Sequence, residues 1–436
     1  MRVGVSYTVL LVVAWGAVGC SGPEAKFVTS EKTQALIPEA KAPIEKSLLD
    51  NFGTPHKLVA WQKLPVDYGK AEAENAGHEK AGWKLLNGRN LYMRHCLHCH
   101  GVSGDGNGPT ANYLNPRPRD YRLGEFKFTS TANGIKARSD DLHLTLVNGI
   151  PGTSMPSFAL LKPEELTALV DYVRWLAMRG EFEKKLGDEL TADYSKKAVT
   201  DRTSNKEKPE KRTDIIAALD LLLKGTKEAP AEFPETIKSS ADAMVAAWTG
   251  AEDASNQVIP AHPRQLPSAD SDSISRGRKL YLSTELGCYT CHGLAGKGDG
   301  VSSVNYWPIP GSSPQKNYPE RGLHDVWGNK VKPRNLTLGQ YRGGRRPVDI
   351  YRRVFAGIKG TQMAGFATAL NNNKDEDGKE VKNTDGSALN DAQVAALRDR
   401  KIWDIVNYVL DIPYQDQTVA PIMPKAPAAA PQTAAK

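Results

Sequence analysis

The sequence predicts a mostly α-helical chain made of two tandem copies of one small domain, joined by a partly helical connecting segment. Two observations predict this fold class. A long motif occurs twice, and each copy ends in a run with apolar residues at helical spacing, while the alternation typical of strands is scarce. We expect the domains at residues 82–180 and 275–413, and the connecting region at residues 181–274.

Residues 1–19 are predicted to be a secretory signal peptide, because Arg2 precedes a short apolar run that ends at Val18. The small residues before Cys20 resemble the bacterial lipoprotein signal, in which this cysteine is acylated, although Ala17 stands where such signals more often have leucine. The alternative is an ordinary signal peptide, or an uncleaved anchor, with an incidental Cys20. We expect an exported, lipid-anchored protein on the periplasmic side of a bacterial membrane.

The next segment, residues 20–81, carries scattered Pro, Lys and Glu and is predicted to be a membrane tether for the first domain. No later stretch approaches the length of about 20 apolar residues that spans a bilayer. The chain has 57 Lys and Arg against 50 Asp and Glu, a net charge of +7. This balance indicates an ordinary solvated surface, and we expect no nucleic-acid partner.

Four of the five cysteines lie in two C-x-x-C-H runs, Cys96–His100 and Cys288–His292. This run is typical of c-type haem attachment, in which two thiols bond to one haem and the adjacent histidine faces the iron. A zinc site or a redox dithiol is the alternative for a single run, and two runs in register with a larger repeat favour two haem c groups. The predicted attachment residues and proximal ligands are Cys96, Cys99, His100, Cys288, Cys291 and His292.

The repeat extends to both sides of these runs. Gly88–Tyr92 corresponds to Gly277–Tyr281 before the run, and Pro118–Asp120 corresponds to Pro333–Asn335 after it. If Cys20 belongs to the leader, no thiol remains for a disulfide, a zinc site or a nucleophile.

A gapless match joins Gly149–Phe158 to Gly357–Phe366, and each segment contains a Gly-Thr-x-Met run that ends at Met155 or Met363. Flanking glycines let the backbone pass close to a flat ring. We predict that Met155 and Met363 are the sixth ligands of the two irons, which raises the reduction potential and leaves no open position for a substrate.

Both copies resemble class I cytochrome c domains, over about residues 82–180 and 275–413. The resemblance implies that the first and last helices of each copy cross at a glycine and at aromatic residues. In this sequence the implied contacts are Gly88 and Tyr92 with Tyr172, and Gly277 and Tyr281 with Tyr408. Such small domains bury little apolar surface, so the haem is expected to fill much of each core.

The resemblance also implies that a proline carbonyl accepts a hydrogen bond from each proximal histidine. The candidates in the first copy are Pro109, Pro116 and Pro118. Three histidines without a counterpart in the other copy are expected on the surface or in loops: His95, His143 and His324. Met363 precedes Ala364, where the first copy has Pro156.

Within residues 181–274, apolar residues from Ile215 to Leu223 and the run Ala241–Trp248 predict two helices that pack on one or both domains. Residues 414–436 are rich in Ala, Pro and Lys and are expected to be disordered.

Irons held on both sides pass electrons and bind no substrate, so we expect an electron carrier, or an electron-transfer subunit of a respiratory complex, and no enzyme. By family resemblance alone, its partners are a quinol-oxidising complex and a terminal oxidase. One alternative is a di-haem enzyme, such as a peroxidase or a thiosulfate-oxidising protein with one open haem. Another is a passive sensor or structural haem protein.

Overall fold

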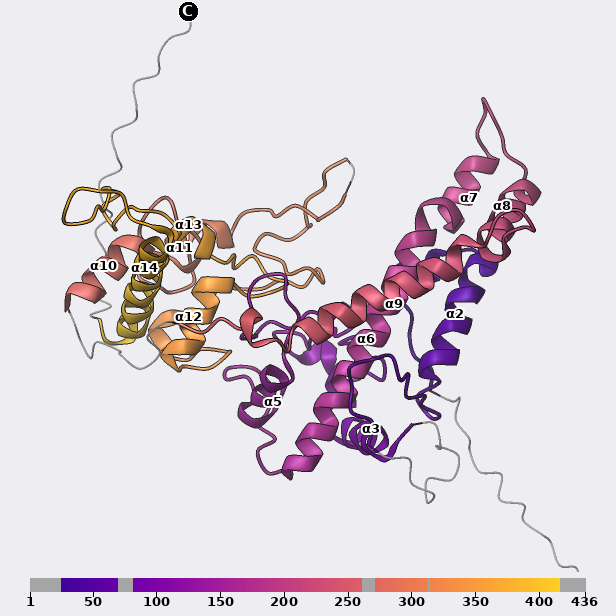
Figure 1. The fold of residues 1–436 in the computed structure, drawn as a ribbon, viewed down its shortest axis with the longest axis horizontal. Coiled ribbons are helices and arrows are strands. Elements are labelled where there is room, and N and C mark those ends of the chain that lie inside the picture. Colours follow the sequence, from indigo (N-terminus) through magenta and orange to yellow (C-terminus); the bar gives the residue numbers. More distant parts are fainter. Residues whose placement is uncertain (1–24, 70–80, 261–270, 313, 416–436) are drawn as a thin grey trace, which may run out of the picture.

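The computed structural model describes residues 25–69, 81–260, 271–312 and 314–415. The β pairings among these residues are isolated bridges, and the rest are helices and loops, so the predicted mostly α fold class is confirmed. Figure 1 shows one group of helices that contains α2 to α9 and a second group that contains α10 to α14.

The α-helices are α1 (Glu31–Ala35), α2 (Pro38–Phe52), α3 (Trp83–His95), α4 (Leu97–His100), α5 (Ser139–Asn148), α6 (Pro163–Tyr194), α7 (Lys196–Thr203), α8 (Arg212–Lys224), α9 (Glu232–Gly250), α10 (Ser271–Tyr281), α11 (Cys288–His292), α12 (Pro347–Ala356), α13 (Ala367–Leu370) and α14 (Asp391–Asp411). Short 3-10 turns are η1 (Ala111–Tyr113), η2 (Ala254–Asn256), η3 (Val301–Ser303), η4 (Leu336–Leu338) and η5 (Ile412–Tyr414).

The first domain is built around the crossing of α3 on α6. Gly88 of α3 lies so close to the carbonyl oxygen of Ala168 that a Cβ atom there would clash with it. One turn further on, the rings of Tyr92 and Tyr172 lie 5.2 Å apart between centroids. The Tyr92 hydroxyl donates a hydrogen bond of 2.8 Å to the carbonyl of Gly101, directly after the first C-x-x-C-H run. The predicted crossing is confirmed, and it positions that run.

The crossing of α10 on α14 repeats this arrangement in the second half of the chain. A Cβ atom at Gly277 would clash with the carbonyl of Asp404. The rings of Tyr281 and Tyr408 lie 5.2 Å apart between centroids, and the Tyr281 hydroxyl donates a bond of 2.7 Å to the carbonyl of Gly293. The internal repeat therefore extends from sequence to tertiary contacts.

Residues 25–69 differ from the predicted tether. They form α1, α2 and a following loop that pack on α6 as part of the first core. Ile44, Leu48 and Phe52 of α2 are buried, and the Phe52 ring lies 5.4 Å from that of Trp175 on α6. These apolar side chains recur every four residues among the Pro, Lys and Glu, and this spacing places them on one buried face of a helix.

The connecting region also enlarges the first domain. Helix α6 continues to Tyr194, beyond the predicted domain end at residue 180. Helix α9 runs beside α6 (Figure 1). Met244 and Trp248 of α9 are fully buried, and the Trp248 Nε1 donates to a Glu181 carboxylate oxygen at 3.0 Å. The predicted helices of this region are present and pack on the first domain.

A buried lysine joins the two halves of the chain. Lys359 is 8% exposed, and its Nζ donates to the Oγ1 of Thr131 at 2.7 Å and to the carbonyl of Ile135. Burial lowers the pKa of Lys359 to about 8. The equivalent residue of the first copy is Pro151, so the repeat does not predict this contact.

Three predictions lie outside the described residues: the signal peptide at residues 1–19, the acylation of Cys20, and the disorder of the tail beyond residue 415. Within the described ranges, no helix combines the length and the apolar character needed to cross a membrane.

We predict that Gly88→Ala lowers the free energy of unfolding by about 1–3 kcal/mol, the usual cost of overpacking, because the new methyl group forces α3 away from α6. Urea denaturation measures the change. The matched control is Gly250→Ala in α9, where no heavy atom lies within 4 Å of the added Cβ and alanine favours the helix. Equal stability of Gly88→Ala and the wild type would contradict the close crossing.

We predict a pH-dependent contribution from Lys359. Its folded pKa of about 8 lies below the ordinary value of 10.5, so the unfolded chain binds more protons between these two pH values. The stability contribution of Lys359 therefore rises as the pH increases from about 8 to 10.5, and its burial penalty is fully present below pH 8. Urea midpoints of the wild type and of Lys359→Met, compared across this window, should show the rise only in the wild type. A difference between them that is independent of pH would contradict the buried position.

Candidate functional site

The first candidate site begins where α3 ends. Cys96 closes α3 and precedes the single turn of α4, and the backbone N–H of His100 donates to the carbonyl of Cys96 at 2.9 Å. Gly101 ends this turn at a φ of 73°, which L side chains rarely adopt. The turn brings Cys96, Cys99 and His100 to the wall of one cavity.

His100 is oriented by a hydrogen bond behind its ring. Its Nδ1 lies 3.1 Å from the carbonyl oxygen of Arg119, and because a carbonyl only accepts, Nδ1 carries the proton and Nε2 keeps its lone pair. The ring also stacks on Tyr121, with centroids 4.6 Å apart. Burial lowers the pKa of His100 to about 4, so the imidazole is neutral at pH 7, which is the form that binds a metal.

The carbonyl that accepts this bond is not the one that the resemblance implied. The implied acceptors were Pro109, Pro116 and Pro118. The acceptor is instead the carbonyl of Arg119, one residue beyond Pro118. The Pro118 carbonyl points toward Gly106. In the second half, the Nδ1 of His292 lies 3.2 Å from the carbonyl of Arg334, which likewise follows a proline.

The methionine segments are folded by the same three hydrogen bonds. The Ile150 N–H donates to the Met155 carbonyl at 3.1 Å, the Thr153 hydroxyl donates to the Ile150 carbonyl at 2.8 Å, and the Met155 N–H donates to the Thr153 hydroxyl at 3.1 Å. The corresponding distances in the second half are 2.9, 2.7 and 3.2 Å, for Ile358, Thr361 and Met363. These bonds explain why threonine occurs in both Gly-Thr-x-Met runs, since its hydroxyl fixes the turn that presents the methionine.

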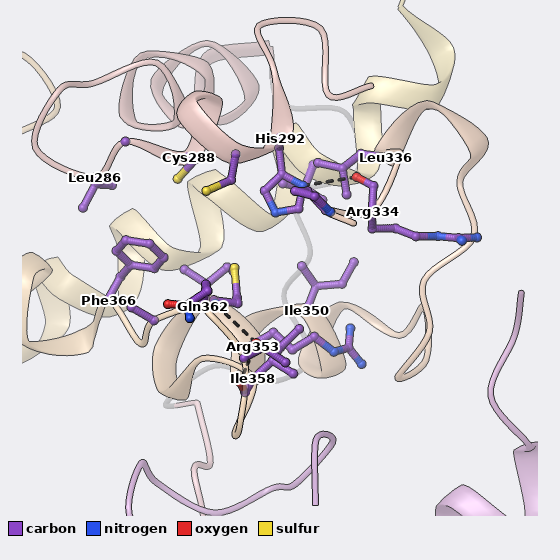
Figure 2. Close-up of a pocket in the computed structure, with 18 of the residues that line it drawn as sticks. Leu286, Cys288, His292, Arg334, Leu336, Ile350, Arg353, Ile358, Gln362 and Phe366 are labelled. Atoms are coloured by element: carbon purple, nitrogen blue, oxygen red, sulfur yellow. Dashed lines mark hydrogen bonds between the residues drawn. The ribbon is translucent and has the colours of Figure 1, made fainter. Parts of the chain in front are cut away.

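The second candidate site is a cavity of about 600 Å³, within the range of about 300–1,000 Å³ typical of ligand and cofactor sites. Figure 2 shows Cys288 and His292 on one wall and Gln362 and Phe366 on the opposite wall. The first cavity is smaller, about 180 Å³. The structure brings the predicted site residues together in two sets: Cys96, Cys99, His100 and Met155 in the first cavity, and Cys288, Cys291, His292 and Met363 in the second.

The thiols do not have the properties of a redox pair. Burial raises the pKa of Cys96 and of Cys288 to about 12, whereas a reactive dithiol needs a lowered thiol pKa. All four thiols are free rather than joined in disulfides. In the part of the chain that the structure describes, no three His, Cys, Asp or Glu side chains are grouped to hold a metal ion, so the geometry does not support the zinc alternative.

Each cavity presents two thiols, a neutral imidazole nitrogen and a thioether sulfur. This donor set fits haem c, because the thiols would form the covalent attachments while the imidazole nitrogen and the thioether sulfur would ligate the iron. Leu336, Ile350 and Val354 line the second cavity and supply apolar walls suited to a porphyrin.

Several residues at these sites were missed by the sequence analysis. Lys127, Phe128 and Arg342 line both cavities. Lys127 and Phe128 come from the first half of the chain, and Arg342 comes from the second. They lie outside the repeat, so no sequence signal marked them. Among the unmatched histidines, His95 is exposed and lines the first cavity, whereas His324 lies in a loop, as expected, but is buried there.

Comparison with known proteins agrees with this donor chemistry. The family model described as Cytochrome c matches residues 85–177, so a cytochrome c domain is present there, and it supports haem-based electron transfer. No curated protein matches the chain. A solved chain of the reducing HAO-like protein complex of Kuenenia stuttgartiensis is similar, with a TM-score of 0.44, 21% identity, and coverage of 75% of this chain and 95% of that one.

This structural neighbour corrects one prediction. We expected an electron carrier and no enzyme, because both irons would be held on both sides. The neighbour is part of a reducing HAO-like protein complex, so the exclusion of an enzyme role does not stand. The physical reason is that a fully ligated haem still delivers electrons to a catalytic centre elsewhere in an assembly. At this TM-score the likeness transfers no activity to the present chain.

Proposed function

We propose that this chain transfers electrons through two covalently attached c-type haems, each ligated by one histidine and one methionine. The observation that carries the proposal is that a C-x-x-C-H run and a Gly-Thr-x-Met run, distant in sequence, line the same cavity in each half of the chain. When bound, haem c supplies a one-electron iron couple.

The chain's own residues hold the haem from three directions. Cys96 and Cys99, or Cys288 and Cys291, provide the thiols for attachment. His100 and His292 offer Nε2 from one wall, and Met155 and Met363 offer sulfur from another segment of the wall. Because the hydrogen bonds behind both histidines and within both methionine segments are the same, we propose that residues 275–413 form a second cytochrome c domain.

We further propose that the protein is exported and anchored by a lipid on Cys20 at the periplasmic side of a bacterial membrane. One support is the apolar leader with small residues before Cys20. The other is the resemblance to c-type cytochromes, in which haem is attached outside the cytoplasm. The proposed donor and acceptor are a quinol-oxidising complex and a terminal oxidase, for which the support is the family resemblance.

We predict two haems per chain. A pyridine haemochrome assay on the purified protein should give a haem-to-chain ratio of two, and Cys96→Ala/Cys99→Ala or Cys288→Ala/Cys291→Ala should each give one. Cys20→Ala is the control, because it should keep both haems while moving the protein from the membrane fraction to the soluble fraction. A ratio of two in either double variant would contradict covalent attachment at that run.

We predict that Met155→Ala and Met363→Ala each lower one of two midpoint potentials, because loss of the thioether ligand removes its preference for ferrous iron. Spectroelectrochemical titration measures both midpoints, and added imidazole or carbon monoxide should bind only the altered haem. Met178→Leu is the control, since Met178 is fully buried in the first core and lines neither cavity. Unchanged midpoints in both alanine variants would contradict His/Met ligation and favour open haems.

A further inference from the structure

The two cavities meet at the junction of the domains. Lys127 and Phe128 belong to the first half of the chain and also line the cavity that holds Cys288 and His292. The Lys127 Nζ lies 3.5 Å from an Asp325 carboxylate oxygen, so this cation has a carboxylate partner from the second half. Arg342, in the loop between η4 and α12, lines the cavity that holds His100. Each domain therefore completes part of the other domain's site.

Arg342 is a cation at this junction without a matching anion among the described residues. Its Nε is buried and has no hydrogen-bond partner there. Burial, and then the positive charge of Arg334, lower the pKa of Arg342. Arg342 is half-buried, but its Nε is cut off from water and its guanidinium has no carboxylate partner among the described residues, so the side chain is suited to face an anionic group in the cavities that it lines.

Arg353 of α12 is a second cation at this junction, with the Asp349 carboxylate near it, and it lines only the second cavity. Its Nε is also buried without a partner among the described residues, although one Nη1 donates to the carbonyl of Gly344 at 3.1 Å. Burial lowers the pKa of Arg353 to about 10, and the nearby Asp349 carboxylate is held by Arg346 at 2.8 Å. Figure 2 shows the Arg353 side chain beside Ile350 in this cavity.

Phe128 and Gly343 place these cations at the junction. The Arg353 guanidinium lies 5.5 Å from the centroid of the Phe128 ring, which crosses from the first domain. A Cβ atom at Gly343 would lie 2.5 Å from that ring, so only glycine lets the Arg342 loop pack against it. The loop that carries Arg342 therefore packs against Phe128, and from this position the Arg342 side chain lines both cavities.

We propose that Lys127, Arg342 and Arg353 form a junction clamp that binds the propionate carboxylates of the haems, with Lys127 and Arg342 serving both sites and Arg353 serving only the second. The proposal rests on the proposed function, since it assigns the ligand group that these cations bind. Arginine matches a carboxylate in a bidentate manner, and a positive charge close to iron stabilises the ferrous state. Because Lys127 and Arg342 line both cavities, loss of either charge should lower the reduction potentials of both haems.

The test is potentiometric titration of the full chain carrying both haems, at low ionic strength. Arg342→Gln should lower both midpoint potentials, and Arg353→Gln should lower one. The matched control is Arg345→Gln, because Arg345 is exposed, donates to the Tyr414 hydroxyl and lines neither cavity, so both midpoints should stay at their wild-type values.

Two outcomes overturn the clamp: unchanged midpoints in Arg342→Gln, or shifts of the same size in Arg345→Gln. If Arg342→Gln does not mature, Lys127→Gln is the second variant, and it should also lower both midpoints because Lys127 lines both cavities. The haem-to-chain ratio of the wild type separates the two proposals. A ratio below two refutes the proposed function, whereas a ratio of two with unshifted midpoints refutes the clamp alone.

Discussion

A glycine at the crossing of two helices sets the distance between each C-x-x-C-H run and the last helix of its domain. At Gly88 and at Gly277 the partner helix comes so close that a methyl group would clash with a backbone carbonyl. Tyr92 and Tyr281, one turn later, then reach the glycine carbonyl after the run. If the helices separated, these hydrogen bonds would lengthen and the histidine would shift relative to the methionine on the other wall. The close crossing is therefore a condition for both cavities.

On this shared scaffold the two halves have different surroundings. The first is enlarged by α1 and α2 before it and by α7 to α9 after it, and apolar side chains of α2 and of α7 to α9 join one core with α6. The second has a smaller core and contacts the first through loops, with Lys359 inserted between Thr131 and Ile135. The copies also differ where the two halves touch, as the exchange of Pro151 for Lys359 illustrates.

The two candidate sites combine neutral histidines with positively charged arginines. The proximal imidazoles are neutral because burial lowers their pKa values, and a carbonyl behind each ring sets the tautomer that leaves Nε2 available. Arg342 and Arg353, in contrast, are cations at the wall of the cavities, with buried nitrogen atoms that no described residue satisfies. Neutral ligands at the iron and positive charge at the junction would favour the ferrous state at both sites.

The sequence alone determined the mostly α fold class and which cysteines, histidines and methionines share each cavity, because these depend on helical spacing and on a motif present twice. The helix crossings were implied by the resemblance to cytochrome c domains. It misjudged residues 25–69, where the four-residue spacing of Ile44, Leu48 and Phe52 was hidden among polar residues. It also left three proline carbonyls open as the acceptor of His100, whereas the acceptor is Arg119, since the direction of a carbonyl depends on the path of the loop around it. Only the tertiary structure decided the junction, because Lys127 and Phe128 are far from Arg342 in the chain and none of the three belongs to the repeat. Their proximity results from how two finished domains pack, which no local pattern encodes.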